Sequence, residues 1–416
     1  MLRSTTRIRN GLEQDKSMTL EFCGYPRSDG RTGIRNLVVV AYLVECAHHV
    51  SREIQYPFRE KGVHLIGFPG CYPNEYSHRL MESICTHPNV GAVLLVSLGC
   101  EGFDRFGLQT SVNQSDRPVE TLVIQENSGT QNTVNLGRAW IEKTLYELED
   151  QPRKNTPIQE LIVGTICGGS DGTSGITANP AVGHAFDRLI DQQVCCIFEE
   201  TGELIGCEVH MQSRAVTPEL GVEIRASVEK AAKYYTTLGY SSFAPGNADG
   251  GLSTIEEKSL GAYSKSGTRS ISGLIKPGDV PNKGGLYLLD VVPDGDVRYG
   301  FPNINDNAEI AELIACGCHL ILFTTGRGSV VGSAVSPVIK VCANPETYRN
   351  LSGDMDIDAG RVLSGDSELD QIGDEIFHLV LQAADGLQTV SEKLFHQEFI
   401  MTYKSFDPIG PSCLPN

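Results

Sequence analysis

The sequence predicts an α/β fold of two domains, each with a mostly parallel sheet flanked by helices. Apolar, β-branched runs of strand length alternate with helical patterns, which is typical of parallel sheets. The strand-like runs are continuously apolar, as expected of strands covered on both faces. The chain of 416 residues is also too long for one simple core. A polar, proline-bearing stretch at residues 150–157 then suggests a connection between two domains.

We expect the first domain at residues 18–150, after a disordered N-terminal extension of residues 1–17. Its expected strands are residues 37–43, 63–67, 89–97 and 118–125, and its expected helices are residues 44–61, 75–86 and 132–149. The layering is Rossmann-like. However, no Gly-x-Gly-x-x-Gly follows the first strand and there is no Walker A pattern, so the sequence predicts no nucleotide site.

The second domain, expected at residues 158–416, is organised around one glycine-rich stretch. A buried strand at residues 160–165 leads into Ile166-Cys-Gly-Gly-Ser-Asp-Gly-Thr-Ser-Gly-Ile-Thr-Ala-Asn-Pro180, and a helical pattern follows. A Gly-Gly pair allows backbone N–H groups to approach an anion, and a helix N-terminus favours negative charge. Ser170 and Asp171 add a hydroxyl and a carboxylate. An ordinary strand-to-helix turn is the alternative for this loop taken alone.

Composition excludes several classes of partner. A formal net charge of −18 argues against nucleic acid or an anionic membrane as the main partner, but it allows a small acidic substrate. No apolar run reaches the roughly 18 residues that span a bilayer. The N-terminus lacks the apolar segment of a signal peptide, and the 13 cysteines are scattered. We therefore expect a cytoplasmic protein with reduced thiols.

Three cysteines lie in glycine-flanked turns at the ends of expected strands: Cys71, Cys100 and Cys167. Ligands of open α/β sheets bind outside the carboxyl ends of the strands. We therefore predict that these thiols hold iron. Three thiolates on an iron–sulfur cluster would leave one iron open to substrate, and a mononuclear Fe²⁺ with mixed ligands remains the alternative. Packing of buried thiols is the ordinary interpretation of any one of them.

Other side chains are candidates for binding an anion or moving a proton. Arg327 stands between two glycines, and its guanidinium matches a carboxylate. Arg35 and Lys258 are further candidates, with surface charge or an internal ion pair as the alternative. The candidates for acid–base chemistry are Glu203, Glu208, His78 and His319. A solvated helix start is the alternative for the two glutamates.

These motifs resemble those of the UxaA family, the altronate and galactarate dehydratases. The resemblance runs from Gly24 to about Gly360. It is carried by Gly33-Ile-Arg-Asn36, Leu98-Gly-Cys-Glu101, the stretch from Cys167 to Pro180, Pro245-Gly-Asn247, Gly250 to Gly261, and Leu322-Phe-Thr-Thr-Gly-Arg-Gly328. It adds Asn247 to the expected substrate-binding residues. Only a short segment precedes Gly33, where typical members carry an SAF-like module. The histidine of the family's turn before Cys71 is replaced here, the turn reading Gly67-Phe-Pro-Gly-Cys71.

The resemblance implies an Fe²⁺-dependent lyase that dehydrates a 2,3-dihydroxy sugar acid to a 2-keto-3-deoxy acid. It also implies that a separate small subunit supplies the SAF-like module, and we expect a homo-oligomer. The first alternative is the large subunit of a (2R)-sulfolactate sulfo-lyase, which releases sulfite instead of water. The second alternative is a non-catalytic paralogue that binds a sugar acid.

Overall fold

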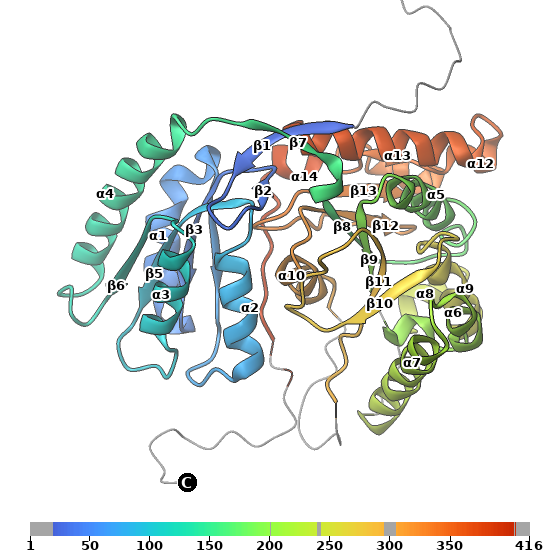
Figure 1. The fold of residues 1–416 in the computed structure, drawn as a ribbon, viewed down its shortest axis with the longest axis horizontal. Coiled ribbons are helices and arrows are strands. Elements are labelled where there is room, and N and C mark those ends of the chain that lie inside the picture. Colours follow the sequence, from blue (N-terminus) through green and yellow to red (C-terminus); the bar gives the residue numbers. More distant parts are fainter. Residues whose placement is uncertain (1–19, 200, 239–242, 295–304, 403, 405–416) are drawn as a thin grey trace, which may run out of the picture.

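The computed structural model describes residues 20–199, 201–238, 243–294, 305–402 and 404. It confirms the predicted fold class, since two parallel sheets with helices on their faces lie side by side (Figure 1). The expected disordered extension, residues 1–17, lies outside the described residues. No helix in the described part of the chain is long and apolar enough to cross a membrane.

The first sheet has four parallel strands in the order β4-β3-β5-β6. Alternate residues of its strands face two separate layers of helices, so both faces are buried, as the apolar runs predict. Helices α1 and α4 cover one face, and α2 and α3 cover the other. The bounds are β3 Leu37–Tyr42, α1 His48–Gln55, β4 Val63–Gly67, α2 Glu75–Cys85, β5 Val90–Ser97, α3 Arg105–Gln114, β6 Val119–Val123 and α4 Thr130–Glu149.

The second sheet has seven parallel strands in the order β10-β11-β9-β8-β12-β13-β14. Helices α5 and α13 pack on one face, and α10 packs on the other. The strands are β8 Ile162–Cys167, β9 Cys195–Phe198, β10 Ile271–Ile275, β11 Gly285–Leu289, β12 Leu320–Thr325, β13 Val338–Cys342 and β14 Ile357–Asp358. The helices are α5 Ala178–Asp191, α6 Glu208–Arg214, α7 Pro218–Leu238, α8 Pro245–Asp249, α9 Ile255–Ser264, α10 Asp306–Ala315, α11 Pro345–Asn350, α12 Arg361–Ser364, α13 Leu369–Ala384 and α14 Val390–Lys393.

A small antiparallel sheet, β2-β1-β7, joins the two halves of the chain. Strand β1 (Glu21–Pro26) pairs with β2 (Thr32–Gly33) and with β7 (Lys154–Pro157). Half of the expected connection at residues 150–157 is therefore a strand. Its side chains are mostly exposed and carry no apolar pattern. Sequence periodicity could not identify β7, because its backbone hydrogen bonds to β1 hold it in place and its side chains form no apolar pattern.

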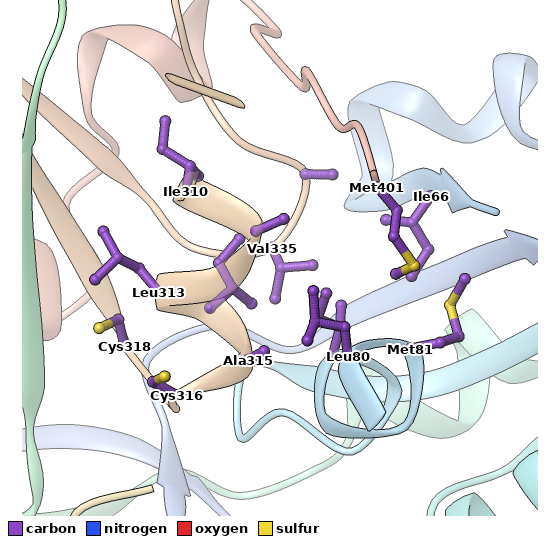
Figure 2. Close-up of a cluster of buried hydrophobic side chains, with 14 of the residues drawn as sticks. Ile66, Leu80, Met81, Ile310, Leu313, Ala315, Cys316, Cys318, Val335 and Met401 are labelled. Carbon is purple, nitrogen blue, oxygen red and sulfur yellow. The ribbon is translucent and has the colours of Figure 1, made fainter. Parts of the chain in front are cut away.

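The two large sheets share one hydrophobic core. Figure 2 shows Leu80 and Met81 of α2 on the side of Ala315 of α10, with Met401 of the C-terminal segment in the same cluster. Met401 is 2% exposed. The C-terminal segment thus packs into the contact between the two halves of the molecule.

Candidate active site

The candidate site lies where the chain reverses its direction across the seven-stranded sheet. From β8 the chain passes through α5 to β9 on one side, and it later returns through α10 to β12 on the other side. The helices α5 and α10 lie on opposite faces of the sheet, so the connection that leaves β8 and the connection that leads to β12 run on opposite sides. Ligands of open α/β sheets bind at such a point.

Backbone hydrogen bonds hold these two loops together. Gly168 N–H donates to Thr324 O at 2.9 Å, and the N–H groups of Gly326 and Arg327 both donate to Gly169 O at 2.9 Å. A side-chain carbon on Gly168 would lie 2.5 Å from Cζ of Phe323. The glycine pair therefore serves close packing of the two loops, and it fixes the positions of the residues around it.

A buried cluster of a thiol, a carboxylate and an ammonium group follows β8. Cys167 Sγ donates to Glu203 Oε2 at 3.1 Å, and Lys258 Nζ forms an ion pair with Glu203 Oε1. Ser170 Oγ lies 3.5 Å from Cys167 Sγ. Glu203 comes from the turn Thr201–Leu204 after β9, and Lys258 comes from α9. The structure thus brings together four of the side chains that the sequence analysis selected.

A cavity of about 230 Å³ lies beside this cluster. Ser170 and Lys258 line it together with residues of the loop after β8 and of α9. A small acidic molecule could therefore reach the region of Lys258 through this cavity.

Asp171 and Asn247 support the loop that carries Ser170. Asp171 Oδ1 accepts from N–H and Oγ1 of Thr173 at 2.9 and 2.6 Å, and Oδ2 accepts from Asn344 Nδ2 at 2.9 Å. Asn247 Nδ2 donates to Ser170 O at 3.2 Å. Both side chains are buried. In this structure their polar atoms hold the loop in shape, and Asp171 also lines the cavity.

Arg327 projects from the loop after β12 and is exposed. Its Nη1 donates to Gly246 O at 2.6 Å. Gly169 packs against it, because a side-chain carbon on Gly169 would lie 3.2 Å from Arg327 Cβ. The rest of its guanidinium makes no hydrogen bond to the residues that the structure describes, so it remains available to an anion.

Asp306, which sequence reasoning missed, lies on the other side of the glycine pair. A side-chain carbon on Gly168 would lie 3.1 Å from Asp306 Oδ2. Burial and then the Glu203 carboxylate raise the pKa of Asp306 to about 6, against the opposing effect of Lys258 and Lys265. The sequence held one indication of this residue. Asp306 begins the helix before β12, and in a parallel sheet such a helix starts at the carboxyl edge, where ligands bind.

Four candidates lie elsewhere. The ring of His319 is buried at the amino edge, where Nδ1 accepts from Ile162 N–H at 3.0 Å and Nε2 lies 3.0 Å from Thr32 O. Ile162 begins β8 and Cys167 ends it, so His319 and the cluster are at opposite ends of the strand. His319 therefore holds backbone groups and does not join the cluster.

The remaining three also have local partners. Arg35 forms a double ion pair with Glu392, at 2.6 and 2.8 Å, which ties it to α14. His78 lies on α2 with its ring centroid 4.3 Å from that of Phe103. Glu208 Oε1 accepts from Gly206 N–H at 2.9 Å within its own turn. None of these contacts connects them to the cluster around Cys167.

The three cysteines predicted to hold iron are not brought together. Cys71 and Cys100 are exposed beyond β4 and β5 of the four-stranded sheet, whereas Cys167 is buried at the end of β8. Among the residues with described positions, no group of three or more His, Cys, Asp or Glu side chains is placed to hold a metal ion. These thiols therefore do not fit an iron site as they are placed here.

The fold and this site define an α/β protein with a buried thiol, carboxylate and ammonium group beside a cavity. Comparison with known proteins identifies the family. Residues 158–406 match the model of the D-galactarate/altronate dehydratase C-terminal domain, and residues 24–149 match the second domain of D-galactarate dehydratase/altronate hydrolase. The chain belongs to the D-galactarate/altronate dehydratase family, as the sequence motifs predict.

Three relatives illustrate the range of the family. The (2R)-sulfolactate sulfo-lyase subunit beta of Chromohalobacter salexigens is 32% identical over 394 residues, covering 92% of this chain and 97% of the relative. The altronate dehydratase of Bacillus subtilis is 29% identical over 388 residues, covering 89% and 75%. The galactarate dehydratase (L-threo-forming) of Escherichia coli is 32% identical over 391 residues, covering 88% and 73%. All three are lyases by name, which supports a lyase here.

Proposed function

We propose that this chain is a hydro-lyase that removes water from a sugar acid of the altronate or galactarate type and releases a 2-keto-3-deoxy acid. The observation that carries the proposal is the family match over both domains. The matched region, residues 158–406, contains Cys167, Glu203 and Lys258.

The contacts around these residues suit the elimination. A base removes the C2 proton, the bond between C3 and its hydroxyl breaks, and the hydroxyl leaves as water after taking a proton. The resulting enol becomes a ketone when C3 gains a proton. Negative charge develops on the substrate during the first step, and a buried ammonium group such as that of Lys258 stabilises such charge. Arg327 is suited to bind a carboxylate.

The proposal keeps three further expectations from the sequence. Dependence on Fe²⁺ rests on the family resemblance alone, since the cysteines do not form a ligand set here. A separate small subunit is supported by the relative named subunit beta, because that name implies a partner chain. The third expectation is that the chain forms a homo-oligomer.

A second candidate function is the elimination of sulfite from (2R)-sulfolactate. The specific observation in its favour is the similarity to the (2R)-sulfolactate sulfo-lyase subunit beta, which is 32% identical to the chain over 394 residues. Both reactions begin with removal of a proton beside a carboxylate, so the cluster serves either one.

The first experiment is a substrate screen on protein purified without oxygen, after iron and acid-labile sulfide have been measured. Aldonates, aldarates and sulfolactate are incubated with the chain, alone and with an added SAF-like small subunit. Release of a 2-keto-3-deoxy acid supports the dehydratase, and release of sulfite supports the second candidate. Binding of an acid without turnover would instead indicate a non-catalytic paralogue.

A matched pair of variants excludes a contaminating activity. Glu203→Gln removes the carboxylate that contacts Cys167 and Lys258, and it should abolish turnover. Glu223→Gln makes the same chemical change on the exposed surface of α7 and should keep the full rate. Equal turnover by both variants would contradict an active site at this cluster.

A further inference from the structure

Asp306 is the first residue of α10, but it does not cap the helix. The preceding Asn305 does so, since its Oδ1 accepts from the N–H groups of Asn307 at 3.0 Å and Ala308 at 3.2 Å. In the described part of the chain, no other side chain donates a hydrogen bond to the Asp306 carboxylate. The carboxylate is partly buried, and it accepts a hydrogen bond from its own backbone N–H in the first turn of α10.

The surroundings of Asp306 are those of the candidate site. Gly168 separates it from the other loop, as a side-chain carbon there would lie 3.1 Å from its Oδ2. The charged groups that act on it are Glu203, Lys258 and Lys265, the last of which is 1% exposed. A negative and two positive groups thus act on a carboxylate that has no side-chain donor among the described residues.

Glu203 differs from Asp306 in this respect. One of its oxygens accepts from the Cys167 thiol at 3.1 Å, and the other is paired with Lys258. To remove a proton from a substrate, Glu203 would have to give up one of these contacts. Among the described residues, Asp306 has no side-chain partner to give up, and its own backbone N–H is its donor. Of the two carboxylates, Asp306 is therefore the one ready to accept a proton.

We propose that Asp306 is the catalytic base that removes the C2 proton of the 2-hydroxy acid. This inference rests on the proposed function. The C2–H bond breaks and its proton passes to the carboxylate of Asp306. The electron pair forms the C2=C3 double bond as the C3 substituent leaves with its bonding pair. The acid formed at Asp306 then returns its proton to solvent or to the leaving group.

Two features of the site agree with this role. Lys258 and Lys265 provide the positive charge that stabilises the developing anion. The pKa of Asp306, raised to about 6 mainly by burial, leaves the carboxylate mostly ionised at neutral pH and makes it a stronger base than an ordinary Asp. The rate should therefore fall as the pH decreases through about 6.

The test compares the wild type with Asp306→Asn, Asp306→Glu and a matched control, Asp370→Asn. Asp370 also lies in the first turn of its helix, α13, but its side chain is 81% exposed. The kcat and KM of each protein are measured between pH 5 and 8 on the acid that the wild type converts. Substrate carrying deuterium at C2 is run in parallel.

We expect Asp306→Asn to lower kcat by about 10²–10⁴-fold with little change in KM, as loss of a general base does. The decrease of the rate below pH 6 should disappear from the residual activity, and the deuterium isotope effect should grow. Asp370→Asn should behave as the wild type. If Asp306→Asn does not fold, Asp306→Glu decides, since a displaced carboxylate should lower kcat and leave KM unchanged.

A rate within threefold of the wild type for the folded Asp306 variant, with the same pH profile, would overturn the assignment and leave the proposed function intact. Failure of the wild type to convert any acid would overturn the proposed function, and the role of Asp306 as a base would fall with it. The two failures are therefore distinguishable.

Discussion

The ring of His319 shows how burial and hydrogen bonding decide the role of a single side chain. Because Nδ1 accepts from the N–H of Ile162, the proton must be on Nε2, which donates to Thr32 O. Burial lowers the pKa of His319 to about 4, so the ring is neutral at physiological pH. Its residue type suggests a proton carrier. The hydrogen bonds of its ring instead connect Thr32 of β2 with Ile162 of β8, in the seven-stranded sheet.

This neutral histidine should make the fold less stable in acid. The unfolded histidine has a pKa of about 6.5, so between pH 6.5 and 4 the unfolded chain binds more protons than the folded one. The free energy of unfolding should therefore fall by roughly 3 kcal/mol as the pH decreases through this range. Urea unfolding at pH 7 and pH 4.5 measures the decrease.

The variant His319→Gln should show a smaller decrease, since glutamine can accept from Ile162 and donate to Thr32 without titrating. The matched change His378→Gln is on the exposed face of α13 and should show the wild-type decrease. An acid dependence that is the same in all three proteins would contradict this role of His319.

At the scale of secondary-structure elements, the carboxyl edge of the second sheet depends on the close approach of two loops. Gly168 lies between Phe323 of β12 and Asp306 of α10. The Phe323 side chain is fully buried, so it cannot move aside for an added methyl group. The position of the loop that follows Cys167 is thus set by the absence of a side chain at residue 168.

The variant Gly168→Ala should therefore be less stable and much less active. Its new carbon would lie 2.5 Å from Phe323 Cζ, and overpacking of this kind costs about 1–3 kcal/mol. Gly353→Ala is the control, since a side-chain carbon on this exposed glycine would meet nothing within 4 Å. Chemical unfolding and the lyase assay compare the two. Equal effects of both variants would show that contact with Phe323 is not the cause.

Much of this arrangement could be predicted from the sequence at the level of elements. Buried parallel strands have continuous apolar runs, and their carboxyl ends meet at one edge, so Cys167, Ser170 and Arg327 could be expected together. Asp306 could not be found in this way, because it does not directly follow a strand; its place at the start of the helix before β12 is the signal that points to the same edge. Cys71 and Cys100 could already be assigned to the first sheet and Cys167 to the second, but periodicity could not reveal how far apart the two sheet edges lie. That separation depends on how the two sheets pack.

At the scale of the whole molecule, the C-terminal segment ties the two sheets together through a buried charge. Glu312 of α10 is fully buried, and it accepts from Tyr76 of α2 and from Lys404, whose Nζ lies 2.8 Å from Oε2. Lys404 also donates to Val291 O at 3.0 Å. Because α10 carries Asp306 at its first turn, this contact connects the packing of the two halves with the position of the proposed base.

The variant Lys404→Met should leave the Glu312 carboxylate buried with Tyr76 as its remaining partner among the described residues. Removing one member of a buried ion pair costs about 3–5 kcal/mol, so unfolding at pH 7.5 should require much less urea. Lys143→Met is the control, because Lys143 is 74% exposed and its pair with Glu147 should contribute less than about 1 kcal/mol.

The loss caused by Lys404→Met should also depend on pH, with a sign that identifies Glu312. Burial already raises the pKa of Glu312, and Lys404 opposes that shift, so removing Lys404 raises the pKa further. The unfolded carboxyl ionises near pH 4.3 and the folded one at a higher pH, so the unfolded state holds fewer protons between these values. The free energy of unfolding of the variant should therefore fall relative to the wild type as the pH rises from 5 to 7.5.

Adding Glu312→Gln should remove this pH dependence, because no carboxyl then remains to titrate. A loss that is the same at both pH values would mean that Lys404 acts through packing and its bond to Val291, and not through the charge of Glu312.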